Sequence, residues 1–252
     1  MTQQGTGTTA DRLIADLDKR RTRNTRHAAT EAEAGRAAQG SGFSDDPQDS
    51  PGGQDNALLD LAHSGGLTTE HLRRMVGVEA QCQHTELAAF ALMASRFPHR
   101  PAADLYDEMA GLVRAAQPSL ADCAKALGMS EHDFRHGPRT YRSYAFGGML
   151  SWIALQGSQA ATALALHTDL TVYLSGCAEL VRAIREADIR VPDEFLRHYG
   201  TASAPELLAL AVKATDDGLR RGDDPATAVL AAWLLERSLS DFWRAAAEPA
   251  AH

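Results

Sequence analysis

The chain has 252 residues, 44% of them hydrophobic, and a formal net charge of −8. This length suits one large domain or two small ones. The negative charge argues against a nucleic-acid partner, because phosphates select basic surfaces. The sequence also lacks an apolar run of the roughly 18 residues that a membrane span needs. We therefore expect neither nucleic acid nor membrane as a partner.

The three cysteines, Cys82, Cys123 and Cys177, are widely spaced and odd in number. They fit neither a disulfide framework nor a paired metal-ligand motif. The first residues, Met1-Thr2-Gln3-Gln4, lack the basic and apolar regions of a secretory signal. Together these features predict reduced thiols and a cytoplasmic protein.

Residues 1–56 are rich in Gly, Ser, Thr, Ala, Asp and Gln and poor in large apolar side chains. Such a composition buries too little apolar surface to offset the entropy of ordering, so we predict a disordered, low-complexity extension. Within it, residues 11–26 can form a short helix with Leu13, Ile14 and Leu17 on one side. This helix is either transient in solvent or docked on the core or on a partner.

From Ala57 onward the pattern is helical almost throughout, and residues 57–252 are expected to form one domain. No segment alternates apolar and polar residues with a period of two, so the fold class is all-α, a single helical bundle. Pro118 is expected to kink or divide its helix. The predicted helices span residues 69–97, 104–127, 192–199 and 204–220, a pair within 141–186 that meets near Gly157, a short turn from Ser130, and a last helix from Asp224-Pro225.

On the helix 69–97, Glu79, Cys82, Gln83 and Glu86 follow the spacing i, i+3, i+4 and i+7, which places them on one face. A carboxylate that turns toward the core must have a partner or face a wet cavity, because burying it alone is costly. Alternatively, the helix is simply amphipathic and its carboxylates lie on the solvated side. Both interpretations stay open at the level of spacing.

Later in the chain, His167 and Asp169 interrupt an apolar helix whose small residues let neighbouring helices approach closely. Tyr144 precedes the Gly147-Gly148 break, and Tyr199 ends a short helix. A buried tyrosine hydroxyl needs a partner, and a polar ligand is one solution. Each tyrosine can equally be an ordinary anchor at a helix end.

Three segments resemble the TenA/thiaminase II family in their order and spacing. They are Leu72–Glu79, the apolar stretch Gly147–Leu174, and a terminal helix that closes on Phe242-Trp243. The resemblance covers roughly residues 58–247. It implies the haem-oxygenase-like helical bundle, which encloses a small-molecule pocket, and it implies a homo-oligomer.

The resemblance also implies roles for particular residues. Glu79 stands where the family carries an acidic residue, usually Asp, that binds the substrate's aminopyrimidine. Asp169 falls on or next to the family's nucleophilic Cys, and this chain is similar to a branch that uses carboxylate chemistry instead. The family's catalytic Glu precedes its Phe-Trp pair by three residues. Leu239 occupies that position here, so Glu236, one turn earlier on roughly the same face, is the candidate.

The predicted function is therefore a TenA-like C–N hydrolase, an aminohydrolase or amidohydrolase, acting on a pyrimidine-like or related amine. One alternative is a non-haem di-iron oxygenase or oxidase, which needs Glu-x-x-His pairs that this chain lacks in register. The other is a non-catalytic ligand-binding regulator. No metal and no cofactor are predicted. The predicted site comprises catalytic Asp169 and Glu236 and substrate-binding Glu79, Cys82, Tyr144, Tyr199 and His167.

Overall fold

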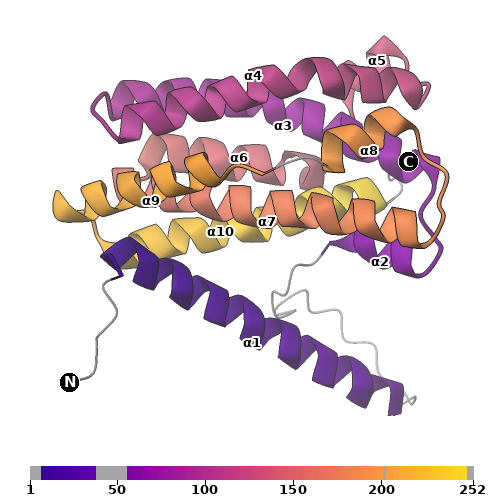
Figure 1. Ribbon diagram of the computed structural model, residues 1–252, viewed down its shortest axis with the longest axis horizontal. Coiled ribbons are helices and arrows are strands. Elements are labelled where there is room, and N and C mark those ends of the chain that lie inside the picture. Colours follow the sequence, from indigo (N-terminus) through magenta and orange to yellow (C-terminus); the bar gives the residue numbers. More distant parts are fainter. Residues whose placement is uncertain (1–6, 38–55, 201–202, 249–252) are drawn as a thin grey trace.

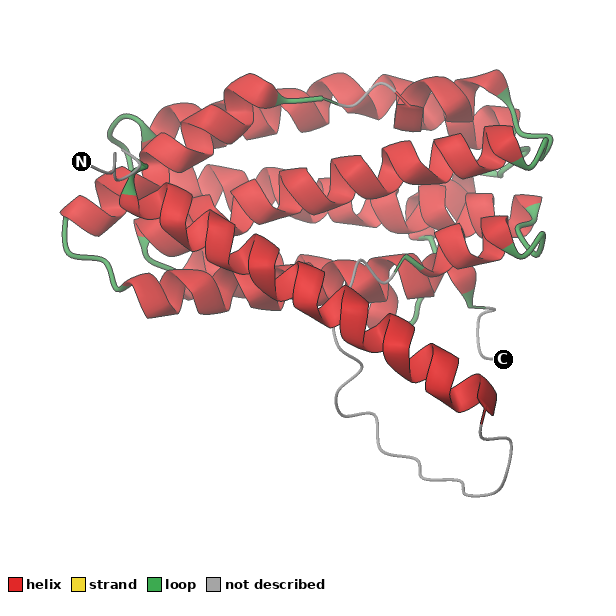
Figure 2. Ribbon diagram, turned by 60° about the horizontal axis from the view of Figure 1, so that its bottom comes forward, coloured by secondary structure: helices red, strands yellow, loops and turns green. Residues whose placement is uncertain are grey.

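The computed structural model describes residues 7–37, 56–200 and 203–248, and the regular elements within these residues are all helices (Figures 1 and 2). Among the described helices, none combines the length and the apolar character that a bilayer span requires. The helices are α1 (Thr9–Ala37), α2 (Ala57–His63), α3 (Thr69–Arg96), α4 (Ala102–Ala126), α5 (Glu131–His136), α6 (Tyr141–Gln156), α7 (Gln159–Glu186), α8 (Asp193–Gly200), α9 (Pro205–Arg220) and α10 (Pro225–Ala247).

The long core helices begin and end within one or two residues of the bounds predicted from the sequence. The junction between α6 and α7 shows why. Gly157 has no room for a side chain, because an added Cβ would lie 2.6 Å from the carbonyl oxygen of Ile153. Ser158 then caps α7, its hydroxyl accepting a hydrogen bond from the backbone N–H of Ala161.

Helix α4 continues through Pro118, so the proline does not divide it. Proline lacks the N–H that an interior helical hydrogen bond requires and crowds the preceding turn. Apolar burial on both sides of the proline offsets this cost, since Val113 before it and Leu120 after it are both buried. Tertiary packing thus outweighs the local preference.

The bundle is organised around α7, which packs against α10, α9, α2 and α8. The core helices run along the long axis of the molecule, with α3 and α4 forming one layer beside α6, α7, α9 and α10 (Figure 1). Every side chain from Ala160 to Leu166 is fully buried. The small residues in this stretch allow the close approach of neighbouring helices that the sequence predicted.

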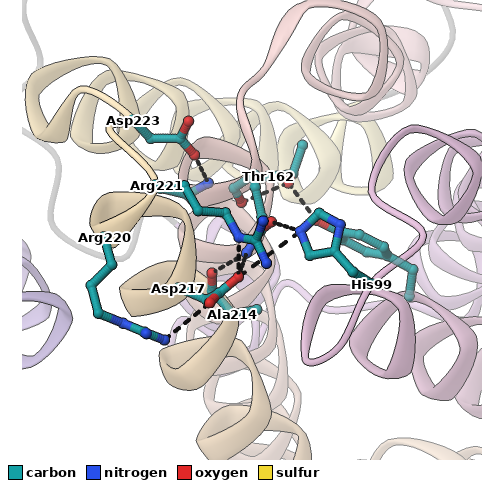
Figure 3. A network of polar contacts seen from close by, with 10 residues as sticks. His99, Thr162, Ala214, Asp217, Arg220, Arg221 and Asp223 are labelled. Carbon is teal, nitrogen blue, oxygen red and sulfur yellow. Dashed lines mark hydrogen bonds and ion pairs between the residues drawn. The ribbon is translucent and has the colours of Figure 1, made fainter.

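A polar network joins the start of α7 to α9 and to the loop before α4 (Figure 3). Gln159 lies 2.7 Å from the His99 ring nitrogen through Oε1, and its Nε2 donates to Asp217 at 3.0 Å. Arg220 and Arg221 also donate to Asp217, at 3.0 and 2.7 Å. The hydrogen bond from Gln159 and those from the arginines lower the pKa of Asp217. This network fixes the register of α7 against α9.

Helix α1 crosses the bundle obliquely and contacts α9 and α10 (Figures 1 and 2). Its Ala10 and Leu17 are buried. The short helix expected over residues 11–26 is therefore part of a longer helix that docks on the core, one of the two alternatives left open by the sequence. The rest of the predicted extension and linker, residues 1–6 and 38–55, lies outside the described residues.

Candidate functional site

A partly open cavity of ≈ 140 Å³ lies between α3, α4, α6, α7, α8 and α10. Its walls are mostly apolar, and its polar groups come from α3, α7 and α8. The polar lining residues are Glu79, Cys82, Gln83, Glu86, Asp169, Tyr173, Cys177, His198 and Tyr199. The apolar lining residues are Met109, Leu112, Val113, Ala116, Phe146, Leu170, Leu174, Leu239 and Phe242.

Glu79 is the most extensively hydrogen-bonded carboxylate of the cavity, and it is buried, with 7% of its surface exposed. The Tyr173 hydroxyl donates to Oε2 at 2.8 Å, and Gln83 Nε2 donates to Oε1 at 3.1 Å. His198 Nε2 lies 3.0 Å from the same Oε1. Three side chains from three helices thus converge on one carboxylate and fix its orientation.

His198 links α8 to two other helices. Its Nδ1 lies 2.6 Å from Ser119 Oγ on α4, and its Nε2 faces Glu79 on α3. Helix α8 is held in place by Phe195 and Tyr199, which are both buried. His198 is not among the site residues predicted from the sequence. The signal was available, because Phe195, His198 and Tyr199 follow the spacing i, i+3 and i+4 on one face of a short helix.

Asp169 and Glu86 differ from Glu79 because, within the described part of the chain, neither side chain accepts a hydrogen bond. Asp169 is buried, and desolvation raises its pKa to about 7. Burial also raises the pKa of Glu86 well above its ordinary value, and the charges of Asp169 and Glu79 add to the effect. Burial therefore favours the protonated form of both carboxyl groups, and for Asp169 it brings the pKa to about 7.

The two cysteines of the cavity are poor nucleophiles. Burial raises the pKa of Cys82 well above its ordinary value, and the carboxylates of Glu86, Glu79 and Asp169 raise it further. Burial likewise raises the pKa of Cys177, followed by the charge of Glu79. Because the thiolate is the reactive form, both thiols are inert at neutral pH.

Tyr199 contributes an unsatisfied group to the cavity. Only 2% of its surface is exposed, and its hydroxyl makes no hydrogen bond of normal geometry to the described residues. Burial raises its pKa well above the ordinary value, and the charge of nearby Glu79 and a weak interaction with that carboxylate add to this. A buried hydroxyl without a well-formed hydrogen bond is costly, and this one lines the cavity beside Glu79.

No protein-family model and no curated protein matches the chain. Among solved structures, the chain is similar to a TenA homologue from Pyrococcus furiosus, with a TM-score of 0.58 and 18% sequence identity. The similarity covers 75% of this chain and 89% of that one. The chain has a TenA-like fold. At this level of identity the likeness shows the fold alone, which is the all-α architecture predicted from the sequence.

The TenA-like fold brings four residues of the predicted site together. Glu79, Cys82, Asp169 and Tyr199 all line the cavity. The face of α3 that carries Glu79 and Glu86 points toward the cavity and not toward solvent, which decides between the two interpretations of its spacing. Asp169 projects from the central helix α7, opposite α3.

Three other residues of the predicted site lie away from the cavity. The carboxylate of Glu236 forms an ion pair with Arg21 of α1 at 2.7 Å. His167 has a pKa lowered by burial, and the charges that act on it belong to α1 residues. Tyr144 is 55% exposed on α6. His167 precedes Asp169 by two positions, about 200° around the helix, which explains why it faces α1 and not the cavity.

The phase of α10 explains the position of Glu236. Leu235, Leu239 and Phe242 follow the spacing i, i+4 and i+7 and are buried, and the last two line the cavity. Glu236 is rotated about 100° from Leu235, which turns it toward α1. No carboxylate of α10 therefore faces the cavity, and Glu86 of α3 is the second unpartnered carboxylate.

The arrangement of ligating side chains bears on the di-iron alternative. Across the described ranges, no group of three or more His, Cys, Asp or Glu side chains is placed to hold a metal ion. A di-iron centre needs several inward His and carboxylate ligands on facing helices. The residues present do not fit such a centre.

The raised pKa of Asp169 predicts how stability changes with pH. A pKa of about 7 against an ordinary 3.8 means that ionisation opposes folding, so stability is fully present below about pH 4 and is lost as pH rises to 7. Asp169→Asn cannot ionise. At pH 8 the variant should exceed the wild type in free energy of unfolding by up to about 4 kcal/mol, and near pH 4 by only a few tenths.

Urea unfolding at pH 4 and pH 8 measures this difference. Glu186→Gln, which alters an exposed carboxylate at the end of the same helix, is the matched control and should show no pH-dependent gain. Equal stabilities of wild type and Asp169→Asn at pH 8 would contradict the assignment.

Proposed function

We propose that this protein hydrolyses a C–N bond in a small amino-bearing molecule, a pyrimidine-like or related amine, with carboxyl groups in place of a thiol. The observation that carries the proposal is Asp169, buried in a partly open, mostly apolar cavity, with a pKa of about 7. A group with such a pKa exchanges protons efficiently at neutral pH. Glu86 beside it supplies a second acid.

The two carboxyl groups divide the proton transfers of hydrolysis. Ionised Asp169 accepts a proton from a water molecule as the water oxygen forms a bond to the substrate carbon. Protonated Glu86 gives a proton to the leaving nitrogen as the C–N bond breaks. One water is consumed, its hydroxyl goes to carbon, and the proton on Asp169 restores Glu86 for the next cycle. This is the division of roles that general acid and base catalysis requires.

The remaining polar groups hold the substrate. Glu79, fixed by Tyr173, Gln83 and His198, has the orientation needed to accept a hydrogen bond from a substrate amino group. The Tyr199 hydroxyl donates to a ring nitrogen or to negative charge that develops in the transition state. Preorganised donors of this kind stabilise a transition state without reorganising during the reaction.

An assay for ammonia release from a panel of aminopyrimidines and single-ring amidines tests this function. Asp169→Asn and Glu86→Gln should each reduce the rate about 10²–10⁴-fold, the range expected for a lost acid–base group. Glu236→Gln should keep near wild-type activity, since its carboxylate pairs with Arg21 outside the cavity. Alkylating reagents should leave activity intact.

Full activity of Asp169→Asn, or activity lost on alkylation of Cys82 or Cys177, would show that the chemistry lies elsewhere. Tight binding of panel compounds without turnover of any of them would favour the non-catalytic regulator.

We also propose a homo-oligomer, a dimer or tetramer. The support is the outer face of α6, where large apolar side chains are exposed: Tyr144 at 55%, Trp152 at 44% and Leu155 at 58%. They follow helical spacing, and α6 carries a single charged residue, Arg142. A contiguous apolar face of this kind marks an interaction surface.

Light scattering at micromolar concentration should give the mass of a dimer or tetramer. The double variant Trp152→Glu, Leu155→Glu should lower that mass, because it places charge on the contact face. Leu230→Glu, at another exposed leucine on α10, is the control and should not. A monomeric wild type would rule out the oligomer.

A further inference from the structure

The cavity has an unbalanced charge distribution. Its lining includes three carboxyl groups, from Glu79, Glu86 and Asp169, and none of the described residues that form its walls is a lysine or an arginine. The one basic lining group is His198, and its ring nitrogen already faces Glu79 at 3.0 Å. The cavity therefore has two acidic groups with no positive partner.

Buried carboxyl groups without partners need either a proton or a cation. Burial favours the protonated forms of Asp169 and Glu86, as the raised pKa of each indicates. A bound cation would replace the proton on Asp169 and gain a charge-assisted contact there, while protonated Glu86 accepts a hydrogen bond through its carbonyl oxygen. Glu79 has no such need, because three side chains already surround it.

A second observation points independently to a ligand. The Tyr199 hydroxyl lines the same cavity, is almost completely buried, and lacks a partner of normal geometry among the described residues. An orphaned buried hydroxyl is rare in native proteins and calls for a bonded molecule. The acidic pair and this hydroxyl border the same space.

The size and walls of the cavity limit the ligand. Its ≈ 140 Å³ compares with the roughly 150 Å³ engineered cavity that holds one benzene molecule. Flat and branched apolar side chains, including Val113, Phe146, Leu170 and Phe242, surround the space. A single six-membered ring bearing one small polar group fills such a volume.

We propose that the cavity binds a single-ring organic cation whose amidinium group lies against Asp169 and Glu86, with its ring against the apolar walls. This inference rests on the proposed function and narrows its substrate class. An amidinium carbon carries the bond to be hydrolysed: the water oxygen bonds to it, one C–N bond breaks, and an amide and an ammonium ion form. Charge and atoms balance without any other reactant.

The pH dependence of binding follows from the groups that face Asp169. Helix α3 contributes Glu86, Glu79 and Cys82, helix α7 Tyr173 and Cys177, and helix α8 His198 and Tyr199, whereas α4, α6 and α10 contribute apolar side chains. The cation binds ionised Asp169, so affinity should fall as pH drops below about 7.

Calorimetry with benzamidine and benzamide tests the inference, because the two probes share a shape and differ in charge. At pH 8 benzamidine should bind at least about tenfold more tightly than benzamide, and its affinity should fall about tenfold at pH 6, where only a tenth of Asp169 is ionised. Asp169→Asn should remove most of this preference. Glu186→Gln, on the exposed end of α7, should retain it.

Equal affinities for the two probes, or no binding of benzamidine at millimolar concentration, would overturn the inference. A folded Asp169→Asn protein, checked by circular dichroism, that keeps the full preference would do the same. If that variant does not fold, Glu86→Gln and the wild-type pH series decide the question. Tighter binding of benzamidine than of benzamide, without ammonia release from any amidine or aminopyrimidine, would contradict only the proposed hydrolase activity. Turnover of a neutral substrate, with equal binding of the two probes, would contradict only the proposed cationic ligand.

Discussion

Three carboxyl groups share one small, mostly apolar cavity, and the cost of keeping them there constrains the surrounding structure. An isolated buried charge is too unfavourable to survive, so each carboxyl needs hydrogen-bond donors, a proton or a cation. Glu79 is met by donors, since Tyr173, Gln83 and His198 converge on its two oxygens. Asp169 is met by a proton, with a pKa raised to about 7. The same physics that makes Asp169 unfavourable for folding makes it useful for proton transfer.

A few specific contacts within the bundle position these carboxyl groups. The junction at Gly157 and the polar network around Gln159 set the register of α7, and hence the position of Asp169 further along that helix. The short helix α8 delivers His198 between α3 and α4, where it bridges Glu79 and Ser119. Elements far apart in sequence thus fix a site of only a few side chains.

Much of the fold could be predicted because its signals are local. Helical periodicity, the proline and glycine breaks and the polar caps locate the core helices, and the resemblance carried by Leu72–Glu79 indicated the TenA-like fold. The resemblance identified Glu79 and Asp169 as candidates, and both line the cavity. The orientation of Glu236 could not be predicted, because a one-turn displacement conserves a face only approximately, and the position of α1 decides what that face meets. The spacing of its helix places His198 on the same face as Phe195 and Tyr199, but its contacts with Glu79 and Ser119, which are remote in sequence, could not be predicted.

A residue-specific titration of Asp169 measures directly whether burial in the cavity raises the pKa of this carboxyl group. Protein labelled with ¹³C at aspartate carboxyl groups would be followed by infrared or NMR spectroscopy from pH 3 to pH 9, and the signal of Asp169 would be identified by its absence in Asp169→Asn. We expect the titration midpoint of Asp169 near pH 7, well separated from the midpoints of exposed aspartates. A midpoint near pH 4, the value of a solvated aspartate, would mean that Asp169 is not desolvated in the cavity. It would contradict the role of Asp169 as a group that exchanges protons at neutral pH.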